Sequence, residues 1–218
     1  MFRVRKKELA LKAVEALEKL YPDAFCSLEY KTPFQLLVAT RLSAQCTDAR
    51  VNLVTPALFE KYPDSESLAE ADLKEVEELI KSCGLYKTKA KDLIKMSKAL
   101  NERFEGKVPD NIEDLTSLPG VGRKTANLIL GDVFHKPAVV TDTHFIRICN
   151  RLKLVTTTDP KKVELEMIKY LPPEKSSDFC HRTVIFGRDI CTARIAECDR
   201  CPLDEFCPKE LKKKGKKK

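Results

Sequence analysis

Residues 118–126, LPGVGRKTA, place a glycine-rich turn directly before an apolar helical run that continues to Phe134. Glycine permits backbone conformations that other residues avoid, and it leaves neighbouring amides uncovered. A helix that begins after such a turn presents unpaired N–H groups and the positive end of its dipole, which favour a phosphate. The stretch therefore predicts a phosphate contact with the Lys124 amine beside it. A tight turn between two core helices would have the same pattern.

Four cysteines near the C-terminus have the spacing C-x6-C-x2-C-x5-C: Cys191, Cys198, Cys201 and Cys207. Four thiolates make a sulfur site that suits either structural zinc or an iron–sulfur cluster, and spacing alone does not choose between them. A reducing compartment favours metal over disulfides. Several cations surround the loop, where a metal would hold them in an array suited to phosphate: Arg188, Arg194, Arg200 and Lys209. A purely structural staple is the alternative. The remaining cysteines are expected to be buried free thiols.

Asp142 follows an apolar run and precedes a predicted helix, in the stretch VVTDTH at 139–144. Aspartate is a good helix N-cap because its carboxylate accepts a backbone N–H two or three residues further on. The same carboxylate can also face a cleft, so a structural and a chemical role are compatible. His144 has no His or carboxylate at metal-ligand spacing and is read as a local hydrogen-bonding residue.

Almost every segment that must position these residues is predicted to be helical, and no convincing strand or hairpin pattern occurs. Thr32-Pro33 opens one helix, while Asp48, Asn111, Asp142 and the pair Asp159-Pro160 are predicted to open others. Gly84 is a plausible C-terminal helix glycine. Residues 87–104 form a basic amphipathic helix whose lysines are expected to lie on a solvated face: Lys87, Lys89, Lys91, Lys95 and Lys98. The fold class is therefore all-α.

The net charge of +7 is unevenly placed, because residues 209–218 carry seven lysines and one glutamate. That segment is expected to be a disordered basic tail, and any nucleic-acid surface on the nearly neutral body must be local. No run is long and apolar enough for a membrane, and the first twenty residues lack a secretory core. The expected location is cytoplasmic and nucleoid-associated in a prokaryote, and nuclear otherwise.

Taken together, the motifs resemble those of endonuclease III in the helix-hairpin-helix DNA glycosylase superfamily. The matching pieces run from about residue 8 to 208: LSAQ at 42–45, GLY at 84–86, LPGVGRKTAN at 118–127, DTH at 142–144 and the four cysteines. The lysine tail and Cys46 lie outside that pattern.

The resemblance implies a two-lobed, all-α helix-hairpin-helix DNA glycosylase fold with a C-terminal [4Fe-4S] cluster loop and a groove for DNA. Residues 26–136 would form a helical barrel that includes the hairpin at about 112–134. The N-terminal helix, 1–25, would pack with the cluster domain at 137–208. The four cysteines would hold [4Fe-4S].

The resemblance also assigns DNA contacts. The partner would be double-stranded DNA with damaged pyrimidines or abasic sites. The protein would bind it as a monomer, and no membrane would be involved. The hairpin would grip a phosphate through its amides, and Gln45 and Leu85 would enter the duplex and fill the space of an extruded nucleotide. The expected DNA-binding residues are Gln45, Leu85, Leu118, Gly120, Val121, Gly122 and Arg123.

The expected chemistry is base-excision repair by a DNA N-glycosylase and abasic-site lyase. A neutral Lys124 amine would attack C1′, expel an oxidised pyrimidine and form an imine, after which β-elimination cleaves the strand 3′ to the site. The helix start disfavours the ammonium form of Lys124, whereas the Asp142 charge favours it. Asp142 is therefore expected to accept a proton or to stabilise positive charge on the sugar.

Three other kinds of protein share part of this pattern. Monofunctional mismatch glycosylases on the same scaffold activate water and lack a lysine at the position of Lys124. A non-catalytic helix-hairpin-helix module with a zinc staple would only hold phosphates. An electron-transfer protein built on the cluster is a third alternative.

Overall fold

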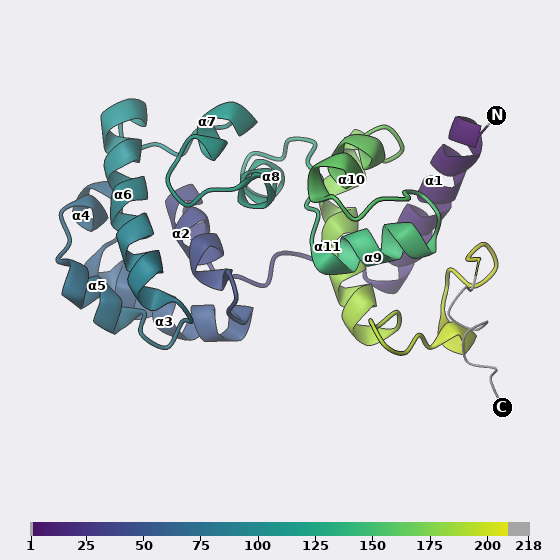
Figure 1. Ribbon diagram of the computed structural model, residues 1–218, viewed down its shortest axis with the longest axis horizontal. Coiled ribbons are helices and arrows are strands. Elements are labelled where there is room, and N and C mark those ends of the chain that lie inside the picture. Colours follow the sequence, from purple (N-terminus) through teal and green to yellow (C-terminus); the bar gives the residue numbers. More distant parts are fainter. Residues whose placement is uncertain (1, 209–218) are drawn as a thin grey trace. The chain divides into compact units, whose positions relative to one another are not determined.

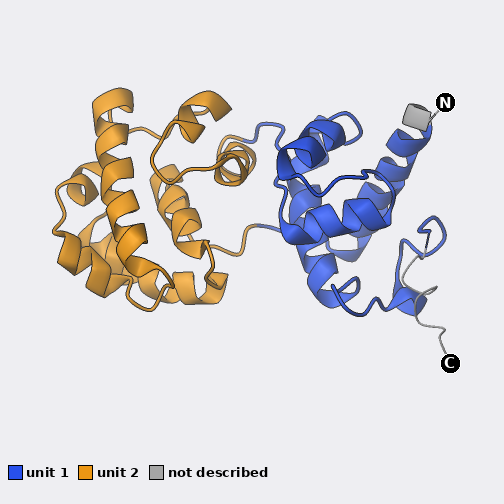
Figure 2. Cartoon of the chain, viewed as in Figure 1, with its two compact units in different colours: residues 1–25, 135–218 blue, residues 26–134 orange. Residues whose placement is uncertain are grey.

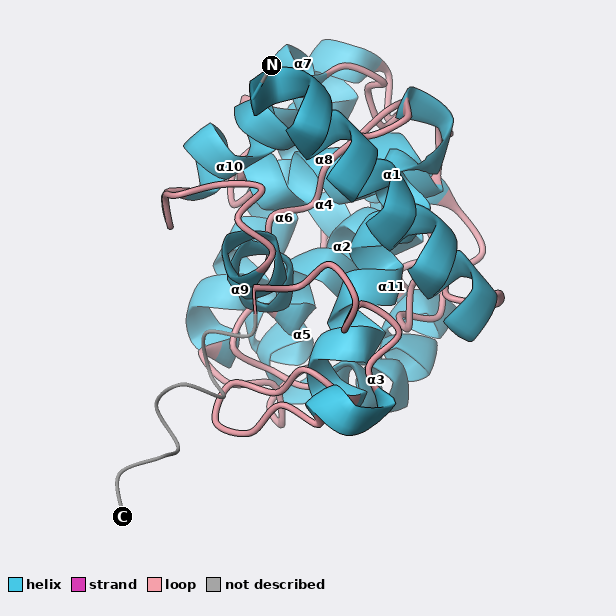
Figure 3. Ribbon diagram, turned by 90° about the vertical axis from the view of Figure 1, so that its right-hand side faces the viewer, coloured by secondary structure: helices cyan, strands magenta, loops and turns pink. Residues whose placement is uncertain are grey.

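The computed structural model describes residues 2–208 and is built from helices (Figures 1 and 3). No strand occurs in that range, where Cys191 and Ala196 form an isolated antiparallel bridge. The all-α prediction is confirmed. None of the described helices combines the length and apolar composition that a bilayer crossing requires. The predicted basic tail, 209–218, lies outside the described residues.

The chain divides into two compact units, shown in Figure 2. Residues 26–134 form unit 2, and the described residues on both sides of that range form unit 1. Unit 1 therefore joins the N-terminal helix to the segment that carries Asp142 and the four cysteines, whereas Lys124 belongs to unit 2.

Unit 2 contains seven α-helices within its range: α2 (Pro33–Ser43), α3 (Asp48–Lys61), α4 (Ser65–Ala69), α5 (Leu73–Leu79), α6 (Tyr86–Phe104), α7 (Ile112–Thr116) and α8 (Arg123–Asp132). Helix α2 packs against α3, α6 and α8, while α4 and α5 cover α6. Apolar side chains of α2 and α6 are fully buried at this centre, including Leu37, Leu42, Leu93 and Leu100. Helix α2 thus lies between α6 and α8 in the packing of unit 2.

Side-chain caps set most of these helix starts. The Thr32 side chain accepts a hydrogen bond from the Gln35 amide, and that of Asn111 accepts one from the Asp114 amide, as predicted. Two predictions were wrong. Thr47, not Asp48, caps α3, and Asp48 is its first helical residue. Helix α5 ends at Leu79, and Leu85 rather than Gly84 has the left-handed backbone.

The basic face of α6 also departs from the prediction. Lys87, Lys91, Lys95 and Lys98 are exposed, whereas the Lys89 side chain is fully buried at 0% exposure. Its Nζ donates a hydrogen bond to the Leu42 carbonyl oxygen at 2.7 Å. A charge in a lysine-rich run looks solvated in the sequence, but here the end of α2 covers it.

Unit 1 is built from α1 (Phe2–Leu20), α9 (Thr143–Arg151), α10 (Pro160–Met167) and α11 (Ser176–Asp189), with short 3₁₀ turns at Pro173–Lys175 and Cys198–Arg200. Helix α11 packs against α1 and α9. The buried rings of Phe145 and Phe179 meet edge to face, 6.0 Å apart between centroids. Asp159 caps α10 as predicted, although this helix ends at Met167 rather than at Leu171.

The turn between α7 and α8 depends on one glycine. Gly120 has a φ of +76°, which side chains rarely tolerate, and a Cβ there would lie 2.8 Å from the Arg41 Nε and 3.2 Å from the Asp92 Cβ. Arg41 forms an ion pair with Asp92, so α2, α6 and the turn meet at this point. A Cβ at Gly122 would meet nothing within 4 Å.

These two glycines make a matched pair for a stability test. Gly120→Ala should destabilise unit 2 by about 1–3 kcal/mol, because the left-handed backbone and the Arg41 contact both oppose a methyl group. Gly122→Ala should cost less, about 0.5–1 kcal/mol, because it loses only the preference of a helix N-cap for glycine over alanine. Urea unfolding of both variants measures the difference, and equal losses would show that the Gly120 geometry is not the constraint.

Candidate active site and cysteine loop

Lys124 lies in the first turn of α8 with its side chain exposed. It forms no ion pair with any residue of 2–208. Gly122 is the N-cap of α8 and supplies no side-chain cap, unlike the residues that begin α2, α3, α7 and α9. The beginning of α8 therefore combines an accessible amine with a helix start that no capping side chain covers.

The predicted hairpin residues share one turn but differ in exposure. Leu118 and Val121 are buried, and the Val121 amide donates to the Leu118 carbonyl at 3.2 Å. Gly122 is exposed, while Arg123 is half-buried. The apolar side chains thus anchor the turn in unit 2, and its backbone, rather than a side chain, faces outward at Gly122.

Gln45 and Leu85 are brought together although forty residues separate them. Both are exposed, Leu85 by 60%, and both have left-handed backbones, with φ values of 54° and 59°. A Cβ at Gly84 would lie 3.4 Å from the Gln45 carbonyl oxygen, so the two loops touch. Such a backbone is unfavourable for non-glycine residues and is concentrated at functional sites.

Asp142 is the N-cap of α9, as predicted. Its Oδ1 accepts a hydrogen bond from the Phe145 amide at 2.7 Å, whereas Oδ2 has no hydrogen-bond donor within residues 2–208. Burial lowers the pKa of the adjacent His144, while the Asp142 charge raises it. One carboxylate oxygen therefore caps the helix, and the other accepts no hydrogen bond within the described residues.

The four predicted metal ligands line one cavity of about 170 Å³ in unit 1. Apolar side chains close its inner wall, among them Ile148, Phe186 and Ile190. Burial raises the pKa of Cys201 to about 11, and the three other thiols add to the rise. Within residues 2–208, no three His, Cys, Asp or Glu side chains converge as a metal-holding group. The cysteines therefore share a cavity in number and chemistry suited to a sulfur-ligated group, without closing on one point.

Two arginines of α9, to which the sequence analysis gave no role, hold the first part of the cysteine loop. Arg151 Nη1 donates to the Cys191 Sγ at 2.9 Å and to the Thr192 carbonyl at 2.8 Å. Arg147 Nη2 donates to the Gly187 and Cys191 carbonyls at 2.9 and 3.0 Å. Their spacing of four residues, which puts both on one helix face, was the available signal. Helix α9 is thus capped by Asp142 at its start, and its last residue, Arg151, contacts the cysteine loop.

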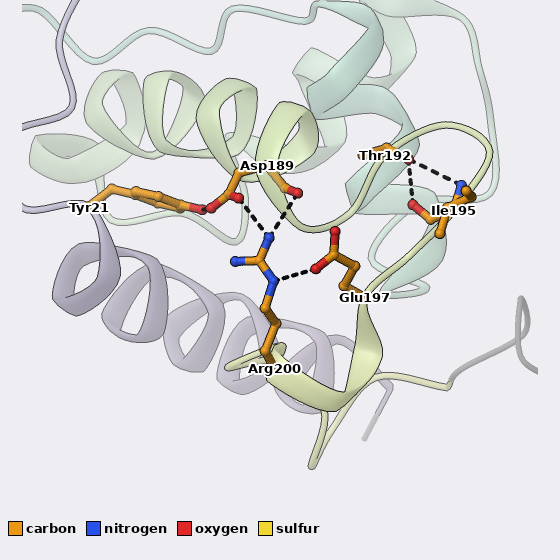
Figure 4. Close-up of polar contacts among 6 residues, drawn as sticks. All are labelled: Tyr21, Asp189, Thr192, Ile195, Glu197 and Arg200. Carbon is orange, nitrogen blue, oxygen red and sulfur yellow. Dashed lines mark hydrogen bonds and ion pairs between the residues drawn. The ribbon is translucent and has the colours of Figure 1, made fainter.

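The predicted array of cations around the loop is only partly realised. Arg200 binds other residues of unit 1 and is not directed at a phosphate. Its Nη2 donates to Asp189 Oδ1 at 2.8 Å, and its Nε donates to Glu197 (Figure 4). The Tyr21 hydroxyl donates to the other oxygen of Asp189 at 2.7 Å. These pairs raise the pKa of Arg200, Glu197 most and then Asp189. Arg194 is exposed, and Lys209 lies outside the described residues.

Comparison with known proteins gives one consistent family. Residues 38–173 match the model of the HhH-GPD superfamily base excision DNA repair proteins. The chain is 48% identical over 204 residues to endonuclease III of Synechocystis sp., covering 93% of each chain. A non-covalent endonuclease III–DNA complex matches with a TM-score of 0.89 and 41% identity, covering 97% of this chain and 99% of that one. A trapped endonuclease III–DNA covalent intermediate matches with the same TM-score and 40% identity, covering 95% and 98%.

The family model includes the turn before α8 and the start of α9, and the endonuclease III relatives cover more than nine-tenths of the chain. Family membership carries with it a family-typical cofactor and DNA as the macromolecule acted on. The chain belongs to the endonuclease III family of the HhH-GPD base excision DNA repair superfamily.

Proposed function

We propose that this chain removes oxidised pyrimidines from double-stranded DNA and then cleaves the strand 3′ to the abasic site, with Lys124 as the nucleophile. The observation that carries this proposal is the exposed Lys124 amine at a helix start without a capping side chain. Relatives at 36–48% identity are endonucleases III, and one such enzyme has been trapped covalently on DNA.

The reaction needs a nucleophile that can leave again. The neutral Lys124 amine attacks C1′, the bond from C1′ to the base breaks, and the base departs with a proton. The bond from C1′ to the ring oxygen O4′ then breaks, and the remaining N–H proton passes to O4′ as the C1′–N double bond forms. The resulting imine acidifies the C2′ protons, so loss of one of them expels the 3′ phosphate. Water then hydrolyses the imine and restores the amine.

Asp142 is assigned to base release. A carboxylate whose Oδ2 is free can accept a proton or stabilise the positive charge that develops on the sugar. The Oδ1 bond to the Phe145 amide fixes its direction. Asp142 and Lys124 come from different units, so their effects can be tested separately.

The DNA contacts are assigned to two surfaces of unit 2. The α7–α8 turn, with Leu118, Gly120, Val121, Gly122 and Arg123, would bind a backbone phosphate through its amides. Gln45 and Leu85 would enter the duplex, where their exposed side chains replace the stacking of an extruded nucleotide. We expect a monomer that works at the nucleoid in a bacterial cytoplasm.

The four cysteines are assigned as ligands of a [4Fe-4S] cluster. Zinc would need four sulfurs at about 2.3 Å from one point. All four cysteines line one cavity of unit 1, and membership of the family implies a family-typical cofactor, which supports the cluster assignment. When bound, such a cluster would staple residues 191–207 to the end of α9.

Loss of the amine gives the first test. Lys124→Ala should abolish borohydride trapping on duplexes with thymine glycol or an abasic site, because no imine can form. DNA affinity should stay within about threefold, since the turn amides remain. Lys91→Ala, which removes another exposed lysine of unit 2, is the control. Trapping that persisted in Lys124→Ala and mapped to another side chain would contradict the assignment of Lys124 as the nucleophile.

The charge of Asp142 can be removed while its helix-capping hydrogen bond is kept. Asp142→Asn should slow base release at least about a hundredfold, yet leave thermal stability nearly unchanged, because Asn and Asp cap equally well. Asp142→Ala should lose the same activity and also about 0.5–2 kcal/mol of stability. Single-turnover base release and thermal unfolding separate the two roles, and an active Asn variant would leave Asp142 as a cap only.

Arg151 should matter to the cluster. Arg151→Met removes the donor to Cys191 Sγ and to three carbonyls of the loop, so we expect faster loss of the cluster to a chelator. Iron and acid-labile sulfide per chain are the measurement, and Arg194→Met is the exposed control. Zinc in place of iron would contradict the cluster assignment, while equal retention in both variants would contradict the role of Arg151.

A further inference from the structure

Lys89 is a buried cation whose presence the core of unit 2 does not require. Its side chain is fully buried, and no carboxylate of residues 2–208 forms an ion pair with it. Burial lowers the pKa of this amine, while the Cys46 and Cys83 thiols act in the opposite direction. An ammonium group without a counter-ion is expensive to bury, and an apolar side chain of similar size would be more stable there.

The bonds of Lys89 reach two loops at once. Its Nζ donates to the carbonyl of Leu42 at 2.7 Å, in the last turn of α2, where carbonyls lack helical partners. Its backbone amide donates to the carbonyl of Leu85 at 3.0 Å. Gln45 follows the first of these carbonyls by three residues, and Leu85 carries the second.

The loops at 43–46 and 83–85, named here the paired loops, also touch each other. A Cβ at Gly84 would lie 3.4 Å from the Gln45 carbonyl oxygen, and the pKa of Cys83 is raised by burial and then by the nearby Cys46 thiol. The left-handed backbones of Gln45 and Leu85 are each unfavourable by about 1–3 kcal/mol and persist only where the surroundings hold them.

We propose that Lys89 is a positioning residue that fixes the paired loops, so that Gln45 and Leu85 enter the duplex together. This inference rests on the proposed function, in which those two side chains occupy the space of the extruded nucleotide. Two groups that act at one base step need a fixed separation, and the bond from Lys89 to Leu42 ties the α2 end to the start of α6. Without that bond the 43–46 loop is free to leave its left-handed conformation.

The test replaces the amine and keeps its volume. Lys89→Met removes the donor from the buried site, and Lys95→Met removes an exposed lysine from the same helix as the control. The duplex carries thymine glycol opposite 2-aminopurine, whose fluorescence rises when it is unstacked. Base release, cleavage at a pre-formed abasic site and thermal unfolding are measured in parallel.

Lys89→Met should unfold at the same temperature as the wild type or higher. Base release should fall about tenfold, as expected for one lost hydrogen bond to a charged donor, and the fluorescence rise should be lost with it. Cleavage at the abasic site should stay within about twofold, because no base has to be extruded there. Lys89→Gln, which keeps a shorter N–H donor, should recover part of the signal, and Lys95→Met should match the wild type.

Three outcomes overturn the inference. If Lys89→Met loses both reactions together with its thermal stability, or neither Lys89 variant folds, Lys89 is only a core residue. If Gln45→Ala and Leu85→Ala lose the fluorescence rise but Lys89→Met retains it, positioning by Lys89 fails while the proposed DNA role stands. If Gln45→Ala and Leu85→Ala both retain the fluorescence rise, the proposed role of these two side chains in the duplex is wrong, whatever the effect of Lys89→Met. In the Gln45→Ala, Leu85→Ala background, Lys89→Met should have no further effect.

Discussion

The ion pair between Arg41 and Asp92 is the contact on which the arrangement of unit 2 depends. Arg41 lies on α2 and Asp92 on α6, and their side chains fill the space beside Gly120 that any Cβ would occupy. Both side chains are mostly buried, with 17% and 24% exposed, so the pair is screened less than a surface salt bridge. One contact therefore joins the helix that leads to Gln45, the helix that follows Leu85 and the turn that precedes Lys124.

In unit 1, arginine side chains also connect separate elements, but they bind carbonyl oxygens instead of carboxylates. Arg147 and Arg151 donate to carbonyls in the last turn of α11 and just after it, and Arg151 also donates to the Cys191 sulfur. Gly187 is required where α11 passes α9, because a Cβ there would lie 2.6 Å from the His144 Nδ1. Helix α9 therefore contacts α11 and the cysteine loop both at its first turn, through His144, and at its last turn, through Arg151.

Most local features of this fold could be predicted from the sequence. A feature that depends on residues distant in the chain could not. Caps such as Thr32, Asn111 and Asp142 involve residues two or three positions apart, and the glycine turn is equally local. Thr47 and Asp48 are both good caps, so the sequence could not rank them. Burial of Lys89 depends on the end of α2, forty-seven positions away in the chain, and helical periodicity carries no information about that contact.

Several departures from ordinary local rules in unit 2 lie together. An unpaired buried cation, two left-handed non-glycine residues and an exposed leucine all lie within the paired loops or bond to them. Natural sequences keep such unfavourable features mainly where function needs them. Unit 2 has other departures as well, since Glu105 is also left-handed, Leu53 is exposed by 71%, and α8 begins without a side-chain cap. At the paired loops, however, several departures coincide between the end of α2 and the start of α6, and these two helices supply the frame that two side chains need to act on one base pair.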